Sequence, residues 1–256
     1  MFPVRSLLIC CAILIAVGPR LVEAASWKAG AAKVSITPQQ SMSMAGYGSR
    51  NHPSTGFLND LYAKALVLED SSGKRAVVIT LDLVGISPDV AGPLLAELEG
   101  KYQLPRAAVA ICCSHTHSGP VVGKNLRSLH YDLLEEGQQK LIDAYAVELR
   151  AKIVDLVGQA IGSLAPSELS CGHGQATFAT NRRNNSEPDV PRLRAEGKLQ
   201  GPFDHDVPVL KVTDSAGKLQ AVLFGYACHA TVLSEYDWSS DYPGFAQAEI
   251  EKSHPG

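Results

Sequence analysis

The sequence predicts a layered α/β domain, in which a mixed sheet is flanked by helices. Short apolar runs with the length of strands alternate with longer segments whose apolar residues recur every three or four positions, as on the buried face of a helix. Two connections between apolar runs are rich in aspartate, serine and glycine, which is typical of β-hairpins. Mixed strands with helices between them favour this layered class.

Three strands are expected in the first part of the chain. The first is short and lies at 33–36. The next two are apolar runs at 63–68 and 76–83, joined by an Asp-Ser-Ser-Gly turn at 70–73. We expect these two to form a hairpin.

Two helices are indicated by their ends as well as by their apolar stripes. Ser87 suits the N-cap and Pro88 the first helical position, and Gly100 is expected to end this helix. A longer helix is expected from about Glu136 to Ile161, with one apolar face.

The second part of the chain adds four strands, at 107–113, 168–178, 207–212 and 219–228. The last two are joined by an Asp-Ser-Ala-Gly turn and predict a second hairpin. The segment 181–201 is a polar excursion between strands. A last helix begins around Pro243, and the chain then ends at Gly256 without a closing strand, so we expect a truncated domain whose C-terminal part is incomplete.

The composition is that of an ordinary globular protein. The chain has 256 residues, of which 45% are hydrophobic and 19% charged, with a net charge of −3. This length suits one large domain or two small ones. The near-neutral charge and the lack of a basic stripe argue against nucleic acid as a partner.

The first 25 residues have the pattern of a secretory signal peptide. Arg5 gives a positive start, 7–17 an apolar core and 22–24 a small-residue cleavage site. The apolar core is too short to span a bilayer comfortably, and no later segment could form a membrane helix. We therefore expect a secreted or periplasmic protein.

Two of the six cysteines lie in this leader. Cys112 and Cys113 are adjacent in a predicted strand, point to opposite faces and cannot pair with each other. A disulfide from Cys228 to Cys171 or to Cys113 fits an oxidising compartment, and buried free thiols are an equally open alternative. The lack of a Cys-x-x-Cys string excludes a thiolate zinc site.

The most informative string is Ser-His-Thr-His-Ser-Gly-Pro at 114–120, directly after the strand expected at 107–113. Side chains at i and i+2 of a strand leave on the same face, so His115 and His117 can converge while Thr116 turns away. Two neutral imidazoles at such an edge form half of a Zn²⁺ site. The residues also leave open a pair of edge histidines that hydrogen-bond to backbone.

His229 follows the apolar run at 219–228 and so repeats the placement of His115. Two separate strands could deliver imidazoles to one edge of the sheet, which favours a metal site more than either histidine alone. A core histidine bonded to backbone is the alternative for His229. Asp82 ends its strand in a similar way and is a weaker candidate for the same edge.

Two further groups could take part in chemistry at this edge. Arg182 or Arg183 could hold a carbonyl oxygen with paired guanidinium donors, or be a solvated loop residue. Asp241 could hold a ligand histidine by its second ring nitrogen, or cap the helix that follows. The other histidines lack a comparable context, and we expect surface or structural roles for them: His52, His130, His173, His205 and His254.

Five strings occur in the order found in the neutral/alkaline non-lysosomal ceramidases. They are Ala-Gly-Tyr-Gly at 45–48, His-Thr-His-Ser-Gly-Pro at 115–120, Asn-Arg-Arg at 181–183, Cys-His-Ala-Thr at 228–231 and Ser-Asp-Tyr-Pro-Gly at 240–244. The second string is the most specific. The match runs from about Trp27 to the C-terminus, so residues 26–256 resemble the N-terminal part of a ceramidase catalytic domain.

The resemblance implies a zinc amidase that cleaves the N-acyl bond of ceramide to give sphingosine and a fatty acid. His115 and His229 would then be zinc ligands. His117 would stand next to the metal, and Arg182 beside the reacting centre. A ceramide-like lipid would be the substrate, and peripheral contact with membrane lipid would be compatible with it. A glutamate and a tyrosine complete the zinc shell of that family, and a serine in a Gly-Asp-x-Ser-Pro string is its nucleophile; this chain contains no Gly-Asp-x-Ser.

Three alternatives compete with this interpretation. An amidohydrolase barrel also uses His-x-His, but on its first strand, and the interval from His229 to Asp241 is too short for the β/α units between its ligands. A metallo-β-lactamase is disfavoured because Gly119 and Pro120 replace its Asp-His. The third alternative is a non-catalytic secreted protein that binds metal or lipid with the same fold.

Overall fold

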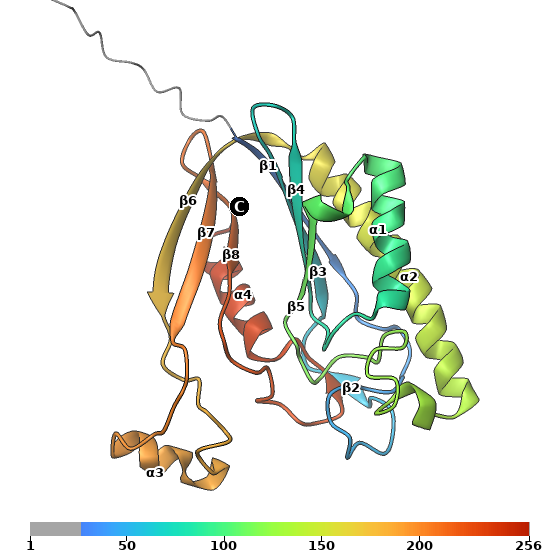
Figure 1. Cartoon of the computed structure of the whole chain (residues 1–256), viewed down its shortest axis with the longest axis vertical. Coiled ribbons are helices and arrows are strands. Elements are labelled where there is room, and N and C mark those ends of the chain that lie inside the picture. The colour runs from blue at the N-terminus through green and yellow to red at the C-terminus, as the bar shows by residue number, and fades with distance from the viewer. Residues whose placement is uncertain (1–26, 256) are drawn as a thin grey trace, which may run out of the picture.

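A computed structural model of the chain describes residues 27–255, and the predicted signal peptide at 1–25 lies outside them. A seven-stranded sheet runs through this part, with helices on both of its sides (Figure 1). The predicted fold class, a layered α/β domain with a mixed sheet and flanking helices, is confirmed.

The main sheet is mixed because only one pair of neighbouring strands is parallel. In spatial order its strands are β5 (Val109–Cys113), β4 (Arg75–Leu81), β3 (Tyr62–Glu69), β1 (Trp27–Ser35), β6 (Ala165–Gln175), β7 (Asp206–Asp214) and β8 (Leu219–Phe224). β4 and β5 run parallel, joined by a helical crossover, and the other neighbours are antiparallel. A separate two-stranded parallel sheet pairs β2 (Gly56–Phe57) with β9 (Asp237–Trp238), which have no counterpart among the predicted strands.

Both predicted hairpins are present, and an aspartate side chain stabilises the turn of each in the same way. In the β3–β4 turn, Oδ1 of Asp70 accepts hydrogen bonds from the backbone N–H of Ser72 at 2.8 Å and of Lys74 at 2.9 Å. In the β7–β8 turn, Oδ1 of Asp214 accepts from backbone N–H groups two and four residues on, both at 2.9 Å. An aspartate side chain that satisfies two turn donors explains why these short connections fold back.

Helices α1 (Pro88–Tyr102) and α2 (Glu136–Gly162) cover one face of the β1–β3–β4–β5 half of the sheet (Figure 1). The main core lies between them, with side chains such as Leu94, Leu98, Ile153 and Leu156 fully buried. Helix α1 does not end at Gly100 as predicted, because it continues for two residues to a left-handed C-cap at Gln103. No helix within residues 27–255 has both the length and the apolar character needed to cross a membrane.

The other helices lie away from this core. The short helix α3 (Val190–Ala195) lies in the polar excursion, beyond the end of β6 and β7 (Figure 1). Helix α4 (Asp241–Ser253) begins two residues before Pro243 and lies on the face of the sheet opposite α1 and α2. Its Glu251 accepts hydrogen bonds from Lys33 and Lys64, whose strand neighbours point into the main core.

Several strand boundaries differ from those predicted. β5 begins at Val109, because Arg106–Ala108 forms a short 3-10 helix, and β5 is an edge strand rather than a buried one. β8 stops at Phe224, four residues before Cys228, and β6 starts three residues earlier than expected. Both segments that carry the predicted histidines therefore leave the sheet before reaching them.

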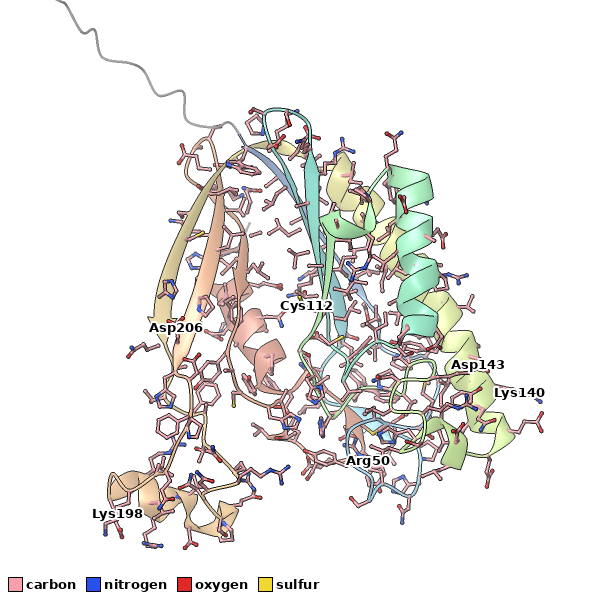
Figure 2. All side chains as sticks on the ribbon, viewed as in Figure 1. Arg50, Cys112, Lys140, Asp143, Lys198 and Asp206 are labelled. Carbon is pink, nitrogen blue, oxygen red and sulfur yellow. The ribbon has the colours of Figure 1, made fainter. Side chains whose placement is uncertain are left out.

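The four cysteines in the described part of the chain are free thiols. Neither of the disulfides left open by the sequence is formed. Cys112 and Cys171 are exposed, and Cys112 lies on the edge strand β5 (Figure 2). Burial raises the pKa of the Cys113 thiol to about 12, which keeps this group protonated and unreactive.

Candidate metal centre

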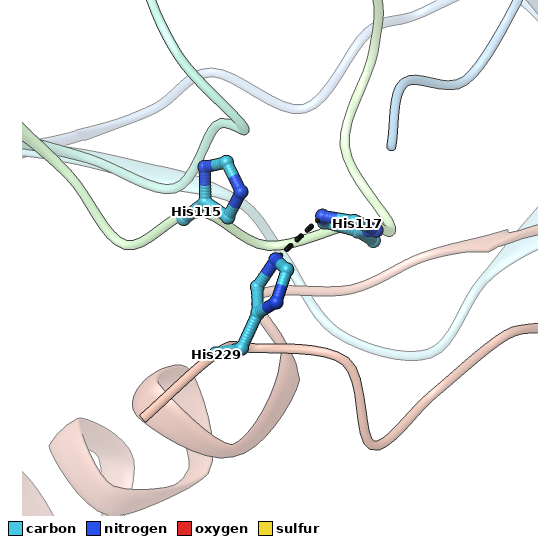
Figure 3. Close-up of side chains that lie close together, drawn as sticks. All are labelled: His115, His117 and His229. Atoms are coloured by element: carbon cyan, nitrogen blue, oxygen red, sulfur yellow. Dashed lines mark hydrogen bonds between the residues drawn. The ribbon is translucent and has the colours of Figure 1, made fainter. Parts of the chain in front are cut away.

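Three imidazoles from two loops converge at one end of the sheet: His115, His117 and His229 (Figure 3). We call these residues the histidine cluster. Their ring centroids are 4.6–5.1 Å apart, and one nitrogen from each ring lies within 4.8 Å of the others. The structure thus brings together the three histidines that the sequence places at a common site.

The local geometry of His115 differs from the strand arrangement that the sequence predicts. Strand β5 ends at Cys113, and His115 adopts a left-handed backbone conformation with a φ of 61°. Its backbone N–H donates to the carbonyl of Leu83 at 3.0 Å, and its Nδ1 lies 2.6 Å from the carbonyl of Val84. A carbonyl can only accept, so Nδ1 carries a proton, and in the neutral ring Nε2 is the nitrogen with a free lone pair.

Thr116, between the two histidines, points into the protein, as expected for its position. Its hydroxyl is fully buried, donates to the carbonyl of Ser239 at 2.7 Å and accepts from the backbone N–H of Ser118 at 3.1 Å. These bonds anchor the loop between β5 and α2 to the start of α4. Strand β5 ends before the two histidines. The turn at His115 and the anchor at Thr116 therefore place the two rings on the same side.

His117 is the buried member of the cluster. Its ring packs against Gly46, where an added Cβ would lie 2.3 Å from its Cγ, and against the ring of Tyr47 at 4.8 Å between centroids. Its backbone N–H donates to the carbonyl of Ala230 at 3.2 Å, which joins its loop directly to the loop of His229. The Nδ1 atom of His117 is buried and has no hydrogen-bond partner in the described structure.

His229 lies on the loop after β8, and its Nε2 is 2.9 Å from Nε2 of His117 (Figure 3). Side chains of neighbouring segments also hold this loop. Tyr242 donates its hydroxyl to the carbonyl of Cys228 at 2.6 Å, and Tyr47 donates to the carbonyl of Leu233 at 3.0 Å. The carboxylate of Asp241 accepts from the backbone N–H of Leu233 at 2.9 Å.

The cluster is electrically suited to bind a cation through nitrogen lone pairs. Burial, and then the neighbouring His229 and His115, lower the pKa of His117 to about 4. Burial and His115 also lower the pKa of His229. Both rings are therefore neutral near pH 7, the form in which imidazole binds metals.

The residues present fit a zinc ion. Two Nε2 atoms that face each other at 2.9 Å can share one proton or bind one cation, but two protonated nitrogens cannot meet there. The bond of His115 Nδ1 to a backbone carbonyl is the usual way in which a ligand histidine is oriented. Imidazole nitrogens that converge from separate loops are donors of the kind that catalytic zinc uses.

The other predicted site residues are not part of this cluster. Arg182 is about half exposed and forms an ion pair with Glu187, within its own loop. Asp241 is fully buried, but it bonds the backbone of Leu233 and Tyr242 instead of the ring of His229. Asp82 accepts from the backbone N–H of Tyr62 at 3.0 Å, and burial raises its pKa to about 6.

Two residues near the cluster were not predicted as site residues. Arg50 donates hydrogen bonds to the carbonyls of Ala45, His117 and Glu235. His130, which we expected to be surface or structural, is buried and accepts from the backbone N–H of Gly46 at 3.2 Å. In the sequence, only the nearby Gly-Tyr-Gly string at 46–48 indicated that this loop belongs to the site.

Known proteins resemble this chain over nearly all of the described part. The sequence model of "Neutral/alkaline non-lysosomal ceramidase, N-terminal" matches residues 27–256. Neutral ceramidase of Pseudomonas aeruginosa is 28% identical over 96% of this chain and 37% of its own length, and that of Drosophila melanogaster is 25% identical over 90% and 33%. The crystal structure of the Pseudomonas aeruginosa enzyme superimposes with a TM-score of 0.72 at 25% identity, covering 90% of this chain and 36% of that one.

The open seven-stranded sheet also excludes the amidohydrolase barrel that the His-x-His string left as an alternative. The chain spans roughly a third of the length of the curated relatives it matches. With its family match, its fold and its motifs in agreement, the chain belongs to the neutral/alkaline non-lysosomal ceramidase family.

Proposed function

We propose that this protein is a zinc-dependent amidase that hydrolyses the N-acyl bond of ceramide to sphingosine and a fatty acid. In this proposal His115 and His229 hold the metal, and His117 and Arg182 act on the substrate. The observation that carries it is the convergence of neutral imidazoles from two distant loops in a member of a ceramidase family. The lipid substrate is inferred from the names of the relatives.

The chemistry of amide cleavage requires a polarised carbonyl and a nucleophile that loses its proton. A zinc ion bound at the cluster would supply the electrophilic charge for both tasks. His117 is held neutral and stands 2.9 Å from His229, so its Nε2 can accept a proton or a hydrogen bond beside the reacting centre. Gly46 and Tyr47 hold its ring in place for that role.

Arg182 acts on the amide oxygen in this proposal. Its guanidinium would stabilise the negative charge that develops on the amide oxygen. In the structure it pairs with Glu187, so it has to exchange this carboxylate for the substrate oxygen. The exposed position of Arg182, on a loop beyond the end of β6, is compatible with such an exchange.

A secreted or periplasmic location and peripheral contact with membrane lipid belong to the same proposal. The location is supported by the pattern of Arg5 and the apolar run at 7–17. Membrane contact is supported by exposed leucines on the loop between His117 and α2, at Leu129 and Leu133.

A second candidate is a protein of the same fold that binds metal or lipid without cleaving amides. It is favoured by the pairing of Arg182 with Glu187, which occupies the guanidinium that the first candidate assigns to the substrate. In this case the histidine cluster would still bind zinc.

Release of a labelled fatty acid from a short-chain ceramide tests the proposal. We expect release by the zinc-loaded chain, loss after chelation, recovery on adding zinc, and loss in His115→Ala. His173→Ala is the matched control, because His173 is exposed on β6 and pairs with Asp206. Equal release before and after chelation would refute zinc dependence, whereas equimolar zinc without release would favour the second candidate.

A further inference from the structure

Arg50 connects three separate segments of the chain close to the histidine cluster. Its Nη1 donates to the carbonyl of Ala45 at 2.8 Å and to the carbonyl of His117, and its Nη2 donates to the carbonyl of Glu235 at 2.8 Å. Figure 2 shows Arg50 at the end of the molecule where these loops meet. Because a guanidinium is planar and rigid, these bonds fix the three carbonyls relative to one another.

Arg50 is held by carbonyls and aromatic rings, not by a close ion pair. Among residues 27–255, no aspartate or glutamate lies within ion-pair distance of its guanidinium. It lies instead between two aromatic rings, 4.8 Å from the centroid of Tyr47 and 5.7 Å from that of Tyr236. Its Nε is buried and has no hydrogen-bond partner in the part of the chain that the structure describes. Arg50 is half buried, so its guanidinium is partly withdrawn from water and directed at backbone carbonyls and rings, a placement suited to fixing the geometry of these loops.

The segments that Arg50 joins are those that position the cluster. One bond goes to the backbone of His117 itself, and another to Glu235, in the loop after β8 that carries His229. Tyr47, which stacks on the guanidinium, also packs against the ring of His117 and donates to the carbonyl of Leu233 in that loop. The guanidinium of Arg50 therefore holds the loops of His117 and His229 in a fixed position relative to each other.

We propose that Arg50 is a positioning residue of the metal centre, which sets the distance between the imidazoles of His117 and His229. Arg50 acts through backbone carbonyls and rings, and it does not touch the substrate or the metal. This inference rests on the metal site of the proposed function. Arg50 thus has a different part from Arg182, which the proposed function places at the substrate oxygen.

Co²⁺ binding to the chain tests this inference, since the visible spectrum of bound Co²⁺ reports both affinity and ligand geometry. We expect Arg50→Met to weaken Co²⁺ binding by about tenfold or more and to alter the spectrum, while its far-UV circular dichroism stays that of the wild type. Arg50→Lys should show an intermediate loss, because one ammonium cannot reach three carbonyls together. The control Arg192→Met removes an arginine that is 57% exposed and bonded only to nearby residues of its own segment, and we expect wild-type binding.

The outcomes separate this inference from the proposed function. If the wild-type chain does not bind Co²⁺, the proposed metal site itself is wrong. If the wild type binds and folded Arg50→Met binds within about twofold of it, the role of Arg50 is wrong. Should Arg50→Met not fold, Arg50→Lys decides by the same criterion. Failure of both variants to fold would also contradict the inference, because Arg50 would then support the fold as a whole.

Discussion

The Nε2 atoms of His117 and His229 lie 2.9 Å apart although the two residues are 112 positions apart in the chain. This contact is made by two loops that leave the sheet at β5 and β8, on its opposite edges. This short contact depends on the residues that hold the two loops. Substitutions of these residues are therefore expected to change stability or metal binding.

The first prediction concerns the pH dependence of stability of the metal-free chain. The pKa of His117 is lowered to about 4 in the fold, against about 6.5 in an unfolded chain. Between these values the unfolded chain binds more protons than the fold, so acidification favours unfolding. We expect the free energy of unfolding to fall as the pH drops from about 6.5 to 4, and His117→Gln to reduce this slope. Urea titrations in the presence of a chelator measure it, and an unchanged slope in the variant would count against the neutral His117.

Asp82 should behave in the opposite direction. Burial raises its carboxyl pKa to about 6, so the fold binds a proton that the unfolded chain has already lost above about pH 4. Stability from this group therefore decreases as the pH rises from about 4 to 6, and the loss persists above that range. We expect Asp82→Asn to stabilise the chain at pH 7.5 by about 1–3 kcal/mol, since its amide oxygen can still accept from Tyr62. Denaturation at pH 7.5 and at pH 4 checks it, because a gain equal at both values would contradict the account.

Gly46 is predicted to be essential for the placement of the His117 ring. Its φ is 98°, and an added Cβ would lie 2.3 Å from Cγ of His117. We expect Gly46→Ala to displace this ring, to weaken zinc binding and to destabilise the chain by about 1–3 kcal/mol. Gly48→Ala is the matched control, because a Cβ there meets no atom within 4 Å. Equal zinc affinity in the two variants, measured by competition with a chromogenic chelator, would show that the contact is unimportant.

Asp241 is predicted to order the loop of His229 rather than its ring. Its carboxylate accepts from the backbone N–H groups of Leu233 and Tyr242, and its own φ is 54°. Asparagine tolerates this conformation and keeps one acceptor oxygen, whereas alanine does neither. We therefore expect Asp241→Ala to lower stability by about 1–3 kcal/mol and Asp241→Asn by clearly less. Thermal unfolding of both variants tests the order, and equal losses would point to the charge instead.

The sequence predicted the layered sheet well because its strongest indications are local. The aspartates that satisfy the turns, at Asp70 and Asp214, act within four residues of their own position, and they mark both hairpins correctly. The ends of β5 and β8 were predicted poorly. There the backbone leaves the sheet for contacts with distant segments, such as that of Thr116 with Ser239, which no local pattern reveals.

The candidate site, too, was predicted only in part from the sequence. The meeting of His115, His117 and His229 was expected, but from strand geometry that the left-handed backbone of His115 replaces. Arg50 could not be recognised, because its partners are backbone carbonyls that carry no residue identity. The structure shows Arg182 only in a local ion pair, so its assignment depends on the motif alone.

The zinc content of the purified chain tests the central claim most directly. After loading with zinc and exhaustive dialysis, elemental analysis should find about one zinc per chain in the wild type and in the control His173→Ala. It should find almost none in His115→Ala or His229→Ala, because each substitution removes one of the proposed ligands. A wild-type chain that retains no zinc, or a His115→Ala chain that retains as much as the control, would contradict the account.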